Sequence, residues 1–349
     1  MKKILFILIS VAMVGYTSCS KEKMESSLPL GLPGTTIFDM AIDNNYVLYF
    51  VTGEIDKSVP HYSLLSSFIP CKYYLSRTSG KTEILDDRYQ YGGRLCFDKN
   101  NHLLTHDGKA IYRIDGRLRD KIFELPDEDQ MPFQTLLSFI VVDNDNNIWA
   151  GGSQTGLYEI DNHLNVTHYH VNNSELPTNN LSAIHVDNNN DLWIITERIG
   201  ENHGILKISN DQWDFYSADH SDITFQMISC LVTDKNGHLW TGAGWNTENQ
   251  SLMRFDGSHW ETINPRENKE GVIAGSVYCL QSAGSRVYAA SLQYTDTAFI
   301  YELLTFDGIK WSKENKIPKD GLIINMLVDN HRQTVWVATS NQGIFKIPF

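Results

Sequence analysis

The chain contains 349 residues, of which 42% are apolar and 20% charged, and its formal net charge is −13 at pH 7. This is the composition of a globular protein, and the length exceeds what a single compact core usually holds, so two domains or a repeat architecture are both open. No run of Lys and Arg is longer than the N-terminal pair. Because nucleic acids and anionic membrane surfaces require concentrated positive charge, we expect no direct binding to either.

The N-terminus has the organisation of an export signal. Two lysines precede an apolar run from Ile4 to Val14, and small residues then lead to Cys19. The run is too short to span a bilayer, which favours a secretory leader. A Cys directly after the apolar run resembles the bacterial lipoprotein signal, in which that Cys carries the lipid, although Tyr16 stands where such signals usually have Leu. We therefore expect a lipoprotein-like leader over 1–18 and lipidation at Cys19, with plain secretion as the alternative.

One ten-residue pattern recurs along the rest of the chain. It is clearest as DNDNNIWAGG, from Asp143 to Gly152, and each copy has one bulky residue near its middle. Successive bulky residues are 55, 45, 44, 47, 48 and 48 positions apart, and they are Tyr49, Leu104, Trp149, Trp193, Trp240, Tyr288 and Trp336. This regular spacing predicts an internal repeat with seven units.

Every unit has the same order of elements. An apolar run precedes the Asp/Asn/Gly turn, a short strand surrounds the bulky residue, a third strand follows (GLYEI, GILKI, SLMRF, GIFKI), and a fourth, more polar strand carries an aromatic residue, as in QWDFY. Four short strands in each repeated unit are typical of a β-propeller. We therefore predict an all-β fold over 35–349, a seven-bladed β-propeller with four-stranded antiparallel blades.

The acid-rich start of each copy is open to two interpretations. Asp143 and Asp145 alternate like the ligands of a calcium loop, but other copies, such as DKNGH and DNHRQ, lack the alternate acids. Asp and Asn tolerate the left-handed conformation and bond their own backbone, which suits a tight turn. We predict a turn between the first and second strands and no metal site. The repeated Trp residues should pack between blades.

The last copy ends after its third strand, at GIFKIPF. In propellers, a strand from the other terminus often completes the final blade and so removes a free sheet edge. Residues 19–34 are therefore expected to be a tether and a possible closing strand. The stretch from Ser27 to Thr36 is Pro-rich and would make a poor strand, so the closing strand is expected to be short or missing.

The repeated pattern of an apolar run, D-x-x-G/N-x-L/I-W-x-G/T and G-L-x-x-[YF] resembles the two-component-regulator propeller repeat. That repeat occurs in periplasmic sensor regions and in stand-alone exported proteins. The copies that begin at Asp143, Asp187, Asp234 and Asp329 match it best. Together with the leader, the resemblance implies an exported lipoprotein of Bacteroidetes type in the cell envelope. The lipid at Cys19 would attach it to the outer membrane, on the periplasmic or the surface side.

The loops opposite the short turns vary in length, and variable loops on a fixed scaffold usually carry binding sites. Several of them place aromatic residues beside amides and acids, a combination that suits sugar recognition. Trp245 could instead pack over a neighbouring blade. The predicted ligand-binding residues are Trp245, Asn246, Glu248, Tyr294, Asp296, Arg198, His203, His61 and Tyr62.

These features favour a non-enzymatic binding or scaffold protein of the envelope, with no catalytic residue and no cofactor, whose ligand is a glycan or a partner protein. The first alternative is a propeller enzyme, either a polysaccharide lyase or a glycosidase. The stretch Leu192 to Ile208 is also similar to a blade of virginiamycin B lyase-type propellers, which use His, Glu and magnesium, and His185, Glu197 and His203 are the local residues of those types. The second alternative is a structural subunit of an envelope complex.

Overall fold

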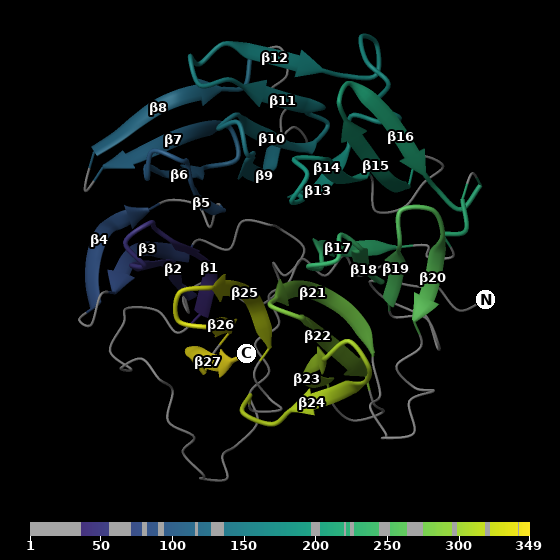
Figure 1. Ribbon diagram of the computed structural model, residues 1–349. Helices are drawn as coiled ribbons and strands as arrows, with labels where there is room; N and C mark the ends of the chain where they lie inside the picture. The colour runs from purple at the N-terminus through teal and green to yellow at the C-terminus, as the bar shows by residue number, and fades with distance from the viewer. Residues whose placement is uncertain are drawn as a thin grey trace, which may run out of the picture.

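Seven small antiparallel sheets form a ring around a central axis, as Figure 1 shows. This computed structural model describes residues 36–55, 71–78, 82–89, 94–115, 118–126, 136–196, 203–219, 221–223, 227–243, 252–263, 275–294, 299–317, 322–340 and 342–349. All regular elements in these ranges are strands, so no helix there could cross a membrane. The predicted seven-bladed β-propeller is confirmed.

The strands of each blade follow chain order, and the first strand of each lies nearest the axis (Figure 1). Blades one to three contain β1 (Thr36–Ile42), β2 (Leu48–Ile55), β3 (Cys71–Thr78), β4 (Thr82–Tyr89); β5 (Leu95–Phe97), β6 (Leu103–His106), β7 (Ala110–Asp115), β8 (Leu118–Glu124); β9 (Leu136–Val142), β10 (Ile148–Ser153), β11 (Leu157–Ile160) and β12 (Val166–Tyr169). Blades four and five contain β13 (Leu181–Val186), β14 (Leu192–Thr196), β15 (Gly204–Ser209), β16 (Gln212–Tyr216); β17 (Ile228–Thr233), β18 (Leu239–Ala243), β19 (Leu252–Phe255) and β20 (Trp260–Ile263). Blades six and seven contain β21 (Ser276–Ala283), β22 (Arg286–Tyr294), β23 (Phe299–Phe306), β24 (Trp311–Glu314); β25 (Ile323–Asp329), β26 (Thr334–Thr339) and β27 (Ile344–Pro348).

Blade seven has three strands among the described residues, where the other six blades have four. It packs directly on blade one, where Trp336 and Phe50 share one buried apolar cluster. Tyr46 also stacks on His331, with ring centroids 3.8 Å apart, so side chains join the last blade to the first. The predicted closing strand within 19–34 lies outside the described residues.

The turn between the first two strands of each blade confirms the turn prediction. In blade three, the Asp143 carboxylate accepts hydrogen bonds from the backbone N–H groups of Asp145 and Asn147, both at 2.8 Å. Its second oxygen accepts a bond from Trp149 Nε1 at 2.9 Å. Both oxygens are thus used inside the turn. The same indole-to-carboxylate bond recurs in blades four, five and seven, as Trp193 to Asp187, Trp240 to Asp234 and Trp336 to Asp329.

Asparagines in these turns also link neighbouring blades. Asn101, Asn146 and Asn190 adopt the left-handed conformation, with φ of 67°, 70° and 69°. Each side-chain oxygen then accepts a bond from a backbone N–H of the preceding blade. These bonds run from Asn44, Lys99 and Asn144 to Asn101, Asn146 and Asn190, in that order, each at 2.7 Å. Asn can therefore adopt the left-handed turn conformation and also link two blades through its side chain, whereas Gly has no side chain to form this link.

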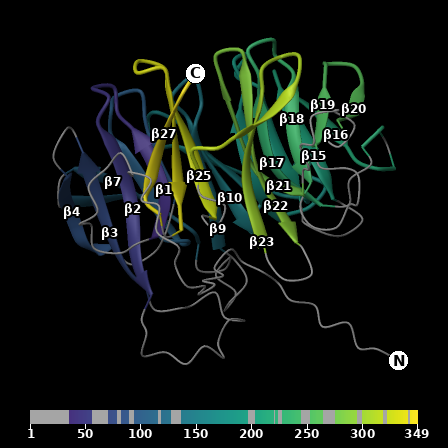
Figure 2. The same cartoon turned by 90° about the horizontal axis from the view of Figure 1, so that it is seen from below.

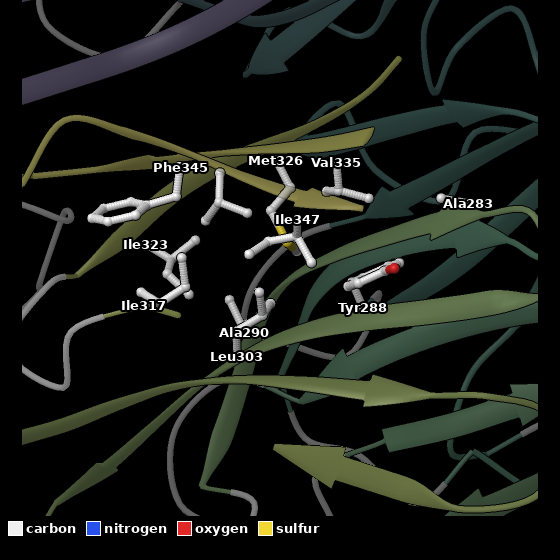
Figure 3. Close-up of a cluster of buried hydrophobic side chains, with 11 residues drawn as sticks. Ala283, Tyr288, Ala290, Leu303, Ile317, Ile323, Met326, Val335, Phe345 and Ile347 are labelled. Carbon is white, nitrogen blue, oxygen red and sulfur yellow. The ribbon is translucent and has the colours of Figure 1, made fainter. Parts of the chain in front are cut away.

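The apolar core lies between the blades, as predicted for the repeated Trp residues. Trp193 of blade four packs with Leu239 and Met253 of blade five, and all three are buried. Figure 3 shows the corresponding cluster between blades six and seven, where Tyr288 and Met326 lie close together. Seen from the side in Figure 2, the strands cross the thickness of the ring, and the C-terminus lies on the face of the short turns.

Candidate functional site

Most of the residues predicted for ligand binding lie outside the described residues. This applies to Trp245, Asn246, Glu248, Asp296, Arg198, His61 and Tyr62, and to Cys19. His203 is half-buried next to β15 of blade four, and Tyr294 is the last residue of β22 in blade six. These two residues belong to blades four and six, which are separated by blade five. The predicted cluster around Trp245 therefore stays a prediction.

The His and Glu set that resembled a lyase is only partly described, because Glu197 lies outside the described residues. His185, on the innermost strand of blade four, is engaged with blade five. Its Nε2 lies 2.7 Å from Thr233 Oγ1 and accepts a hydrogen bond from the backbone N–H of Thr233 at 3.1 Å. Burial lowers the pKa of His185 to about 4. These contacts make His185 an inter-blade link.

An open hollow lies between the outer parts of blades three and four. Its volume is about 530 Å³, which is within the range of small-ligand sites. It is formed by the end of β12, the connection to β13, and the start of β16. Its lining residues are Tyr169, Val171, Asn172, Asn173, Ser174, Glu175, Asp211 and Trp213.

Local hydrogen bonds fix the wall of this hollow. The backbone N–H of His170 donates to Asn173 Oδ1, and Asn173 Nδ2 donates to the backbone carbonyl of His168, both at 2.8 Å. The N–H of Val171 donates to Asn179 Oδ1 at 3.0 Å. These amides hold the connection in one compact turn, so the hollow has a defined shape without a regular element in that wall.

Two aromatic rings and Val171 form the apolar part of the hollow. The Tyr169 ring lies in a row between Trp149 and Trp213, with centroid distances of 6.2 and 5.5 Å. Trp213 corresponds in the repeat to Trp260 and Trp311, which are 8% and 3% exposed. Trp213 is only half-buried, so part of its indole can contact a ligand.

Blade three departs from the repeat at the strand position that faces the bulky residue. In five of the seven blades, a Lys or Arg pairs with that residue across β-strands two and three, and the five are Arg77, Arg113, Lys207, Arg254 and Lys346. Blade six has Thr305 there, and blade three has Glu159 opposite Trp149. Glu159 is thus the single acid at this position in the ring.

Glu159 is linked to the hollow by a hydrogen bond with the lining residue Tyr169. The Tyr169 hydroxyl donates a hydrogen bond of 2.9 Å to Glu159 Oε2. Burial, the bond to Glu159 and the negative charges of Glu159 and Asp211 raise the pKa of Tyr169 to about 12. Both charged side chains that raise the pKa of Tyr169 are therefore negative.

Sequence reasoning missed this hollow, although one signal was present. The third strands read GLYEI, GILKI, SLMRF and GIFKI, and the Glu in the first is aligned with Lys or Arg in the others.

The chemistry of the hollow is that of a binding site. Aromatic faces can stack on a planar or apolar group, and the amides and carboxylates can bind hydroxyl or cationic groups. In the described ranges, no group of three or more His, Cys, Asp or Glu could hold a metal ion.

No protein-family model matches the chain, and no curated protein matches it. Similar solved structures include extracellular domains described as those of the hybrid two-component systems BT3049 and BT4673 from B. thetaiotaomicron. The first is 16% identical with a TM-score of 0.64, covering 90% of this chain and 39% of that chain. The second is 14% identical with a TM-score of 0.62, covering 90% and 41%. The chain therefore spans about two fifths of the length of these domains.

A third similar structure is YCF48 bound to D1 peptide. It is 11% identical with a TM-score of 0.62, and the match covers 92% of this chain and 96% of that chain. At these identities, the likeness shows a shared propeller fold and nothing about shared ligands.

Proposed function

We propose that this protein is an exported, non-enzymatic binding propeller of the cell envelope, and that the hollow between blades three and four binds its ligand, a partner protein or a glycan. The observation that carries the proposal is the coincidence of two features. The hollow combines exposed aromatic surface with amides and acids, and it lies where blade three departs from the repeat. Variation on a repeated scaffold is where binding function is usually found.

The proposed location rests on the leader and on the neighbours in fold. The leader predicts export, cleavage after residue 18 and a lipid at Cys19, followed by a tether over 19–34. The similar B. thetaiotaomicron structures are extracellular domains, and the similar YCF48 structure contains a bound peptide. The extracellular location of the similar domains is in keeping with the proposed export.

We infer that the hollow binds its ligand without transforming it. Tyr169, whose pKa is raised to about 12, stays protonated at neutral pH and is available for hydrogen bonding. Its hydroxyl proton is already donated to Glu159. A ligand that enters the hollow would be held by stacking and hydrogen bonds, and we expect it to leave chemically intact.

Site-specific photo-crosslinking in the native envelope tests this function. Val171 lines the hollow and is 42% exposed, while Ile309, in the turn before β24, is 90% exposed and serves as the control position. A photo-reactive phenylalanine at position 171 should give one discrete adduct that is lost when Trp213→Ala is added. The same residue at position 309 should not give that adduct. No adduct at position 171, or the same adducts at both positions, would contradict the proposal.

A further inference from the structure

Cations over tryptophan rings are built into three blades of the propeller. Lys207 Nζ lies 5.1 Å from the centroid of Trp193, and the Arg254 guanidinium lies 5.7 Å from that of Trp240. Lys346 Nζ lies 4.9 Å from the ring of Trp336. In each case, the cation comes from the position that faces the Trp on the next strand. The repeat thus supplies its own cation to each of these rings.

Blade three keeps the aromatic rings and lacks the cation. Trp149 faces Glu159. Within the described ranges, no Lys or Arg lies over the rings of Trp149, Tyr169 or Trp213. The three rings are in contact, because Tyr169 stacks on Trp149 with an interplanar angle of 18° and lies against Trp213 at a tilt of 58°. Trp149, the counterpart of the rings that carry a cation in other blades, therefore has no cation over it among the described residues, and Tyr169 and Trp213 extend its ring contacts to the hollow.

The charged residues of the hollow also favour a cationic ligand. Glu175 and Asp211 are among its lining residues, none of which is Lys or Arg. Glu159 adds a third carboxylate behind Tyr169. Glu175 and Asp211 are also exposed, so a ligand can reach them from solvent. An aromatic hollow with acidic residues on its walls is complementary to a positively charged group.

We infer that the hollow receives a basic side chain of a partner protein, and that arginine fits it best. The guanidinium would stack on Trp213 and Tyr169 and would have Glu175 and Asp211 as counter-charges. Arginine is favoured over lysine because its planar group stacks on aromatic faces and is less strongly hydrated. This inference rests on the proposed function, since it names the chemistry of the ligand at that same hollow.

The test compares two peptides that differ in charge alone. The probes are acetyl-Gly-Gly-Arg-Gly-Gly-amide and the same peptide with citrulline, a neutral isostere, in place of arginine. Their affinities for the purified protein are measured by ligand-observed NMR. We expect the arginine peptide to bind roughly two- to fivefold more tightly, which is what a partly exposed cation–π contact contributes.

Charge variants locate the binding. Asp211→Asn combined with Glu175→Gln should abolish the preference for arginine over citrulline. Asp120→Asn combined with Glu124→Gln, which also removes two exposed acids but from the outer strand of blade two, should leave it unchanged. No preference in the native protein, or equal losses in both variants, would overturn the inference, because the latter shows only general attraction to an acidic protein.

A second variant restores the missing cation. Glu159→Lys gives blade three the residue type of Lys207 and Lys346, and its ammonium should occupy the ring row from inside. We expect this variant to fold with an unchanged Tm and to lose the arginine preference. A folded Glu159→Lys protein that keeps the preference overturns the inference. If it does not fold, the Asp211 and Glu175 variants decide alone.

The outcomes also separate this inference from the proposed function. A crosslink at position 171 that depends on Trp213, together with no preference for arginine, would mean that the hollow binds an uncharged group such as a neutral glycan. The inference would then be wrong and the proposed function would stand. Absence of the crosslink would contradict the proposed function itself, whatever the peptides do.

Discussion

Replacing Asp143 by Ala is expected to lower the free energy of unfolding by about 2–4 kcal/mol. The carboxylate is 5% exposed and accepts the Nε1–H of Trp149, which is itself 8% exposed. Without it, the indole N–H would remain buried with no acceptor, and two backbone N–H groups would lose their partner. Urea unfolding followed by circular dichroism measures the effect as a lower midpoint at an unchanged slope.

The matched control lies in the same blade. Asp161 forms the same kind of turn, because its carboxylate accepts the N–H groups of His163 and Asn165, both at 2.8 Å. This turn is exposed and has no bond to an indole. Asp161→Ala should therefore cost much less than Asp143→Ala. Equal losses of stability in the two variants would show that the backbone hydrogen bonds of the turn account for the whole effect. The bond between Asp143 and Trp149 would then not explain why the repeat contains both an Asp and a Trp.

Acid should destabilise the protein through His185. Burial lowers the pKa of this histidine in the folded state to about 4, while its ordinary value is 6.5. Between these values, the unfolded chain binds a proton that the folded chain does not. The stability is therefore complete above pH 6.5 and is lost progressively as the pH falls toward 4. At pH 5 the loss from this one group should be about 2 kcal/mol.

His185→Gln isolates this contribution. The variant should lose less stability than the native protein when urea unfolding is repeated at pH 7.5 and at pH 5. His163→Gln is the control, because the side chain of His163 is 80% exposed and lies in a surface turn. An acid dependence that is unchanged in His185→Gln would contradict the assignment. His106, whose pKa burial also lowers to about 4, remains in both variants and cancels in the comparison.

The propeller fold could be predicted from sequence because its signals are local and repeated. The turn residues and the bulky residue of each unit lie within ten positions of each other, and the spacing of Trp149, Trp193 and Trp240 sets the blade length. The bulges on the innermost strands were not predictable in this way. Ser138, Ser182 and Ser229 each stand as the extra residue in such a bulge, but the corresponding residue is Phe38 in blade one and Tyr278 in blade six, so no single residue type marks the position.

The hollow could not be predicted for a different reason. Tyr169 and Trp213 lie in neighbouring blades, and each looks like the ordinary aromatic residue of a fourth strand. Trp213 is half-buried while Trp260 is buried. This difference in exposure depends on how each Trp packs against the neighbouring blade, which the sequence does not show. Glu159 was visible in the sequence, but its meaning required the cation–ring contacts of the other blades.

The central claim is that ligand binds in the hollow between blades three and four. The most direct measurement is fluorine NMR of protein labelled with 5-fluorotryptophan at its eight Trp positions. The signals of Trp213 and Trp336 are assigned by their absence in Trp213→Phe and Trp336→Phe, and the arginine peptide is then titrated. We predict that the Trp213 signal shifts in a saturable manner while the Trp336 signal does not move. A titration in which the Trp213 signal stays fixed while others shift would contradict the claim.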